Sequence, residues 1–267
     1  MSIAAIPLAL AVGSGAIIGL ILGLVGGGGS ILAVPLLVYI VGVSQPHVAI
    51  GTAAIAVALN AAVSLAAHAR LGTVKWRCAM VFAAAGMTGS ALGAEAGKLI
   101  DGERLLAMFG LVMMAVGLAM LRAPAHAGDS AVRLTQASAA HLLPRLLGLG
   151  LATGLLAGVF GIGGGFLIVP GLMLATGMPL ANAVGTSLVA VTAFGLTTAG
   201  SYARSGLIDW PLVVMVAGGG VAGSLLGTRV SAALAGNKRL LAQLFASIVI
   251  MVGAAVLARG AEHLAGG

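Results

Sequence analysis

The chain has 267 residues, of which 60% are hydrophobic and only 7% are charged, and its formal net charge is +7. Soluble domains are about one quarter charged, so this composition excludes a protein whose whole surface faces water. The basic balance does not indicate nucleic-acid binding, because the 13 Lys and Arg residues are scattered over short connections without a cluster. Charges in such places set the topology of membrane proteins.

Apolar segments of about 20 residues recur along the chain, and each is long enough to cross a bilayer as a helix. The first half contains five of them, at 3–25, 30–43, 47–69, 79–97 and 104–122. As a helix the second segment would be roughly 20 Å long, which is shorter than a hydrocarbon core of about 30 Å. It is therefore a partial crossing or one arm of a re-entrant hairpin. Together the segments predict an all-α polytopic membrane protein.

Glycines at four-residue spacing mark several of these segments, as at 89–97 and 219–227. Such rows line one face of a helix and allow a neighbouring backbone to approach closely. We therefore predict helix–helix contacts there rather than ligand sites.

One long polar stretch, 123–142, separates two apolar halves. We expect it to be a cytoplasmic linker between an N-terminal transmembrane repeat, 1–122, and a C-terminal transmembrane repeat, 143–267.

Each half contains a glycine run that interrupts an apolar segment and precedes a proline at the same distance. The first copy, from Gly23 to Pro35, reads GLVGGGGSILAVP, and the second, from Gly158 to Pro170, reads GVFGIGGGFLIVP. In a bilayer such a run frees backbone that must find partners in protein or in a water-filled cavity. Paired interruptions in two halves are the best sequence indication of a transporter's binding site.

The similarity of the halves extends beyond glycine. With a shift of 134 residues, Gly51-Thr52 pairs with Gly185-Thr186, and Trp76 pairs with Trp210. Biased composition would not place Thr and Trp in register, so the repeat is real.

Five segments in each half imply that the halves run in opposite directions, whether the short segment crosses or re-enters. The open alternative is that each interrupted segment forms a single broken helix, which would make the count even. The 13 Lys and Arg residues support opposite directions, because alternate connections then carry nine and four of them. The rule that basic residues face the cytoplasm places the linker inside the cell. We expect inverted repeats, each with a short or re-entrant helix interrupted by glycine.

The doubled glycine motif, with the later Gly51-Thr52 and Gly185-Thr186 pairs, resembles the TauE/SafE family of sulfite and organosulfonate exporters. The resemblance covers about residues 10 to 258. It implies a multi-pass permease of the bacterial inner membrane that exports sulfite, an organosulfonate or a related sulfur oxyanion or carboxylate. One departure is Ser30, where the second copy has Gly165, so the two halves need not contribute equally to a site.

Anion binding is also plausible on physical grounds. Glycines expose backbone N–H groups, a helix that begins after them directs its positive end there, and hydroxyls donate to oxyanions. The alternative is that the glycines serve packing and the hydroxyls bond their own backbone. Asn60, whose counterpart is Phe194, either joins two helices or reaches the site. The predicted substrate-binding residues are Gly27, Gly28, Gly29, Ser30, Thr52, Asn60, Gly163, Gly164, Gly165, Thr186 and Ser187.

We expect a small anion and the lipid bilayer as partners and no nucleic acid, and a homodimer is an open option. The single cysteine, Cys78, allows no internal disulfide, and we expect neither a metal site nor a cofactor. The motifs of serine hydrolases, zinc proteases and phosphate-binding loops are absent from the sequence, so an enzyme is not expected. An anion channel and an uptake carrier for another small organic anion are the alternative functions.

Overall fold

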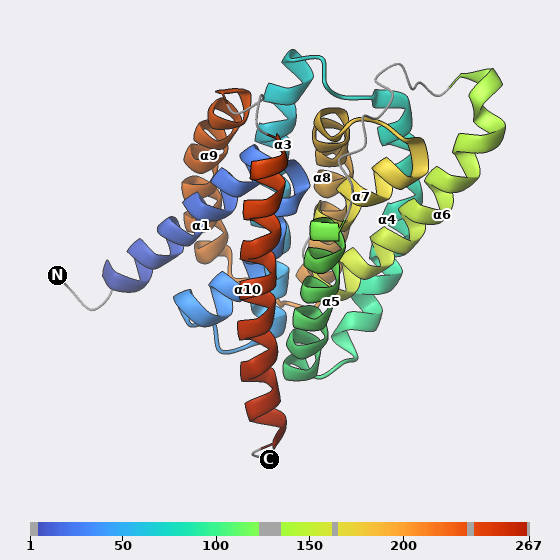
Figure 1. The fold of residues 1–267 in the computed structure, drawn as a ribbon. Helices are drawn as coiled ribbons and strands as arrows, with labels where there is room; N and C mark the ends of the chain where they lie inside the picture. The colour runs from blue at the N-terminus through green and yellow to red at the C-terminus, as the bar shows by residue number, and fades with distance from the viewer. Residues whose placement is uncertain (1–4, 123–134, 162–164, 234–237, 266–267) are drawn as a thin grey trace.

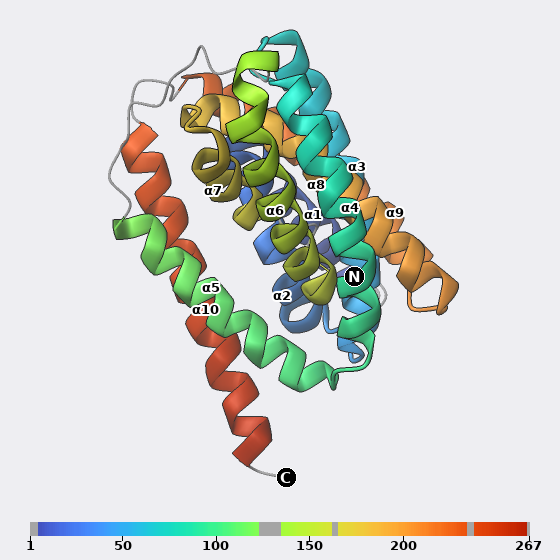
Figure 2. The ribbon, with the colours of Figure 1, turned by 90° about the vertical axis from the view of Figure 1, so that its right-hand side faces the viewer.

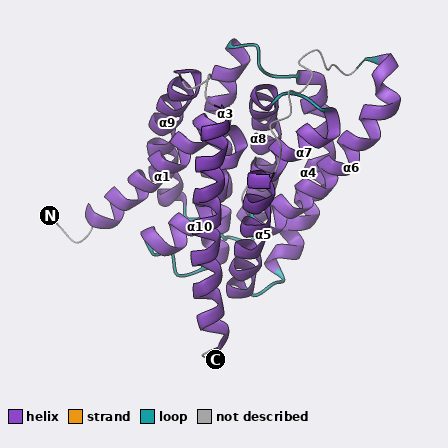
Figure 3. Ribbon diagram, in the orientation of Figure 1, coloured by secondary structure: helices purple, strands orange, loops and turns teal. Residues whose placement is uncertain are grey.

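The computed structural model describes residues 5–122, 135–161, 165–233 and 238–265. These residues form helices and contain no strand, so the predicted all-α fold is confirmed (Figure 3). In chain order the elements are α1 Ala5–Val25, η1 Gly26–Leu32, α2 Ala33–Pro35, η2 Leu36–Val41, α3 Pro46–Arg70, α4 Trp76–Lys98, α5 Gly102–Arg122, α6 Gln136–Phe160, α7 Gly165–Thr176, α8 Leu180–Arg204, α9 Trp210–Ala233 and α10 Lys238–Ala265.

Six of the described helices are long and apolar enough to cross a membrane, namely α3, α4, α5, α6, α8 and α9. Shorter apolar stretches lie in α1, in the η1–η2 segment, in α7 and in α10. The complete helices α1 and α10 have 21 and 28 residues, so in each half a short segment follows the first helix, as predicted.

The ends of equivalent helices use the same device. Gly42 and Gly177 end the two short segments with a positive φ of 85° and 72°. Gly72 and Gly206 do the same after α3 and α8, at 68° and 69°. Only glycine adopts this left-handed conformation at little cost, so it is the usual residue just past a helix end.

Helix α6 begins before the second predicted repeat does. Thr135 caps it, because its hydroxyl accepts a hydrogen bond from the Ser138 amide while Ser138 Oγ accepts one from the Thr135 amide at 2.9 Å. This reciprocal cap starts the helix at Gln136. Residues 136–142 of the predicted linker are therefore helical, and residues 123–134 lie outside the described part.

The two halves are interlocked through their glycine rows. Helix α1 of the first half packs along α9 of the second, and α4 of the first half packs along α6 of the second (Figures 1 and 2). Two pairs of helices therefore join the halves. A Cβ atom at Gly93 would collide with the backbone of Leu155, and one at Gly227 with the backbone of Leu20. The prediction that the rows at 89–97 and 219–227 are close helix contacts is confirmed.

Equivalent helices of the two halves run antiparallel where they touch. In the α3–α8 pair, Gly51 packs against Tyr202, whereas Gly185 near the start of α8 packs against Thr73 just beyond α3. Helices α5 and α10 also cross antiparallel along one flank of the molecule, with Gly110 next to Gly253 (Figure 2). An inverted repeat requires this course, and the sidedness of the connections in a membrane stays a prediction.

Candidate functional site

The segments η1 and α7, which contain or follow the two glycine runs, contact each other in the interior. The chain reverses after α1, so that Gly29 in η1 packs against the backbone of Leu22. The second interruption begins at Gly161, whose φ of 63° ends α6. Helix α7 then folds back along α6, with Gly171 next to the methyl group of Thr153. Elements η1 and α7 are in contact, and both touch α8.

The described residues at this junction are buried. Ser30 in η1 is fully buried, and Gly29 in η1 and Gly165 at the start of α7 are buried as well. Gly27 and Gly28 belong to the first turn of η1. Gly163 and Gly164 lie outside the described residues, so their predicted role stays a prediction.

Three aromatic rings meet between the end of α6 and the start of α7. Phe109 of α5 lies 5.5 Å from Phe160 and 6.4 Å from Phe166, measured between ring centroids. All three rings are buried. The two described ends that flank the second glycine run are thereby joined through one apolar contact with α5.

Thr52 and Thr186 have equivalent partners at opposite ends of the molecule. Thr52 Oγ1 accepts a hydrogen bond from the Asp209 amide at 3.0 Å, and Thr186 Oγ1 accepts one from the Lys75 amide at 3.0 Å. Asp209 and Lys75 are themselves equivalent in the repeat, and each directly precedes a helix of the other half. In each Gly-Thr pair the threonine therefore binds the loop between two helices of the other half.

Geometry separates these two hydroxyls. Gly51 packs against Tyr202 near the end of α8, whereas Thr186 lies near its start, so about 16 residues, or roughly 25 Å of helix, lie between them. A single small anion cannot reach both. Ser187, beside Thr186, donates its hydroxyl to the Val184 carbonyl at 2.7 Å.

Asn60 differs from the other predicted residues. It is fully buried near the middle of α3, and its side chain lies over Gly220 of α9. Neither its Oδ1 nor its Nδ2 atom has a hydrogen-bond partner within the described part of the chain. A buried amide in this state is unusual and needs an explanation.

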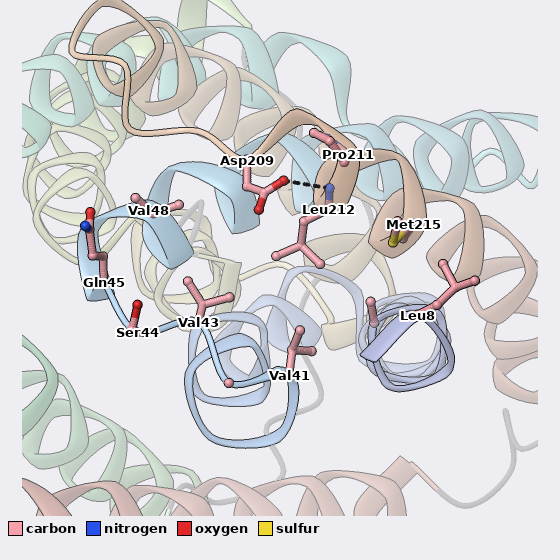
Figure 4. A pocket seen from close by; sticks show the side chains of 12 residues that line it. Leu8, Val41, Val43, Ser44, Gln45, Val48, Asp209, Pro211, Leu212 and Met215 are labelled. Carbon is pink, nitrogen blue, oxygen red and sulfur yellow. Dashed lines mark hydrogen bonds between the residues drawn. The ribbon is translucent and has the colours of Figure 1, made fainter. Parts of the chain in front are cut away.

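Two cavities border equivalent connections of the two halves, although the rest of their linings differs. One of about 690 Å³ is bordered by Gln45, Asp209 and Leu212, and Figure 4 shows Asp209 accepting a hydrogen bond from the Leu212 amide at 3.0 Å. The other, of about 480 Å³, is bordered by Lys75 and Arg77. The two cavities therefore differ in the charge of the residues that border them.

Sequence reasoning missed the residues that hold the connections in place. Asn182 donates its side-chain amide to the Thr73 carbonyl at 2.9 Å, next to the bond between Thr186 and the Lys75 amide. Asp209 is the equivalent of Lys75 with the opposite charge. The positions of Asn182 and Asp209 in the repeat can be identified from the sequence. Their hydrogen-bond partners lie more than 100 residues away, and a single sequence does not specify these partners.

Known relatives agree with the resemblance. The sequence profile of the family described as "Sulfite exporter TauE/SafE" matches residues 11–256. A "Probable membrane transporter protein" from Xylella fastidiosa is 48% identical over 252 residues, which cover 94% of this chain and 95% of that protein.

More distant relatives carry similar descriptions. "Probable membrane transporter protein YunE" from Bacillus subtilis is 28% identical over 263 residues, covering 92% of this chain and 96% of that protein. A probable membrane transporter protein from Methanocaldococcus jannaschii is 28% identical over 240 residues, covering 85% and 86%. No solved structure matches the chain. With its multi-pass helical fold and a profile match that spans nearly its whole length, the chain belongs to the sulfite exporter TauE/SafE family of membrane transporters.

Proposed function

We propose that this transporter is a permease for small anions, and that it exports sulfite, an organosulfonate or a related sulfur oxyanion or carboxylate across the bacterial inner membrane. The observation that carries the proposal is the contact between η1 and α7, the two glycine-interrupted segments, inside the bundle. Backbone freed at such a junction is available to a ligand only where protein surrounds it.

The start of α7 suits a negative charge. The amides of the first helical turn have no partner within a helix, and their dipoles point toward the N-terminus. Gly165 opens this turn without a side chain, and it is buried. An anion next to Gly165 would therefore meet N–H donors in a region with little water.

Electrostatics supports export as the direction. The interior-negative membrane potential favours exit of an anion by about 2.3 kcal/mol per charge for each 100 mV. The cavity next to Lys75 and Arg77 lies in the α3–α4 connection, which the distribution of basic residues assigns to the cytoplasm. Anions would gather at that entrance and be driven outward.

Flux into proteoliposomes tests the proposal. Purified protein should transport radiolabelled sulfite or methanesulfonate at a rate that saturates with concentration and that excess unlabelled anion reduces. Flux that rises linearly without saturation would instead indicate a channel. The proposal fails if vesicles with protein take up sulfite, methanesulfonate and acetate no faster than empty vesicles do.

A further inference from the structure

A cluster of buried polar atoms lies between α1, α3 and α9. Both side-chain polar atoms of Asn60 and the hydroxyls of Ser64 and Ser224 have no hydrogen-bond partner within the described residues. The three residues have relative accessibilities of 0%, 1% and 0%. Ser14 of α1 is buried in the same state. Most buried polar side chains in proteins have at least one hydrogen-bond partner. Several buried polar atoms without a partner on three neighbouring helices are therefore exceptional.

The repeat provides an internal comparison. The counterparts of Asn60, Ser64 and Ser224 are Phe194, Thr198 and Ser90. There, Ser90 Oγ donates to the Phe194 carbonyl at 3.1 Å and lies 2.9 Å from Thr198 Oγ1.

Aromatic packing closes that second half further. The Phe194 ring stacks on Phe82, with centroids 6.3 Å apart and planes 18° from parallel. It also covers Gly86, just as Asn60 covers Gly220. The positions around Phe194 are thus packed with an aromatic ring and have their hydrogen bonds satisfied. The equivalent positions around Asn60 contain polar atoms without a partner.

The cluster lies beside the first glycine run, at mid-depth in the bundle. Asn60 is near the middle of the 25-residue helix α3. Gly19 of α1 packs on Gly220, and Gly23 packs on the backbone of Ser224, three residues before the run begins. An occupant of the cluster would therefore be near the freed backbone of η1.

The chemistry of the cluster favours an anion. Asn60 contributes two N–H donors and one acceptor oxygen, and each serine contributes one O–H donor, so donors outnumber the acceptor of the amide. Helices α1, α3 and α9 contain neither Asp nor Glu, so no carboxylate on them would repel a negative ligand. Orphaned donors are costly in an apolar interior unless an acceptor meets them.

We propose that Asn60, Ser64 and Ser224 bind the oxygen atoms of one small oxyanion, so that the transporter holds its substrate asymmetrically although its halves are repeats. This inference rests on the proposed function and specifies where the anion binds. The oxygen atoms of the bound anion accept hydrogen bonds from N–H and O–H groups that are otherwise unpaired. The equivalent cluster around Ser90 serves packing alone.

Asn60→Leu is the principal test, because leucine has the same branching at Cγ and no polar atom. The KM for sulfite in proteoliposomes should rise about tenfold or more, since hydrogen bonds to a charged ligand are lost. At the same time the melting temperature of the anion-free protein should stay the same or rise, because two orphaned atoms are removed. Ser224→Ala should act in the same direction with a smaller change in KM.

Thr198→Val is the matched control from the closed half. It breaks the bond to Ser90, so it should lower the melting temperature and leave the KM for sulfite unchanged. The inference is overturned if the wild type transports sulfite and Asn60→Leu and Ser224→Ala do so with the wild-type KM. It is also overturned if an experimental structure with sulfite shows only ordered water at Asn60. If the wild type moves none of the tested anions, the proposed function itself fails.

Discussion

The hydroxyl of Thr186 should hold the start of α4 closed, and removing it should expose Cys78. Thr186 is fully buried, and it accepts the Lys75 amide at 3.0 Å, three residues before Cys78. Thr186→Val deletes that acceptor in a buried place, at a cost of about 1–3 kcal/mol. Since 1.4 kcal/mol corresponds to a factor of ten, the population in which the start of α4 is open should rise roughly 5- to 150-fold.

Cys78 is a natural reporter of this opening. It is the one cysteine of the chain, 1% exposed, and it borders the cavity beside Lys75. Reaction of the purified protein with a thiol-reactive fluorophore should therefore accelerate in Thr186→Val by about the same factor as the open population, because labelling follows the open fraction when reclosing is fast.

Two further variants separate local opening from general loss of stability. Thr52→Val removes the equivalent bond to the Asp209 amide at the other end of the molecule, so it should lower the melting temperature with little effect on Cys78 labelling below that temperature. Thr192→Val removes a hydroxyl that bonds only its own helix, to the Leu188 carbonyl at 2.8 Å, and should change neither quantity. Equal labelling rates in wild type, Thr186→Val and Thr52→Val would refute the assigned role of the Gly-Thr pairs.

Two other predictions follow from the packing and the repeat. Leu71→Cys and Ser205→Cys, at equivalent exposed positions just beyond α3 and α8 and each in a chain with Cys78→Ala, should react with a membrane-impermeant thiol reagent from opposite faces of the membrane. Labelling of both from one face would contradict the inverted repeat. Gly93→Leu should reduce the yield of folded protein because a side chain there meets the backbone of Leu155, whereas Gly148→Leu, with open space around it, should not; equal yields from size-exclusion chromatography would argue against the close contact.

The sequence was most informative where it repeats itself. Doubling of the glycine runs, the prolines and the Gly-Thr pairs predicted ten segments, and the boundaries of α3, α4 and α5 fall within three residues of the predicted apolar stretches. A glycine row predicts a close contact but not the partner, so the exchange of α1 and α4 between halves was not predictable. That choice depends on the shapes of two distant surfaces.

The predicted site was less accessible to sequence reasoning. A buried threonine looks the same in a sequence whether it meets an anion or a backbone amide, and for Thr52 and Thr186 the structure places an amide there. Asn60 was distinguishable because it breaks the symmetry of the repeat, with Phe194 as its counterpart. A difference between the repeats, rather than a match, therefore marked the residue on which the proposed anion site depends.

The exchange of helices between halves has a consequence for the order of synthesis. Helix α1 ends at Val25, and its partner α9 begins roughly 185 residues later. At 5–20 residues per second the ribosome needs about 10–40 s to cover that distance. Helix α1 is therefore made long before its final neighbour, and its row of glycines meets lipid or insertion machinery in the meantime. The contact between α1 and α9 is equivalent in the repeat to the contact between α6 and α4. Two separate chains, each with one half of the helices and inserted in opposite orientations, would therefore form both contacts without this delay.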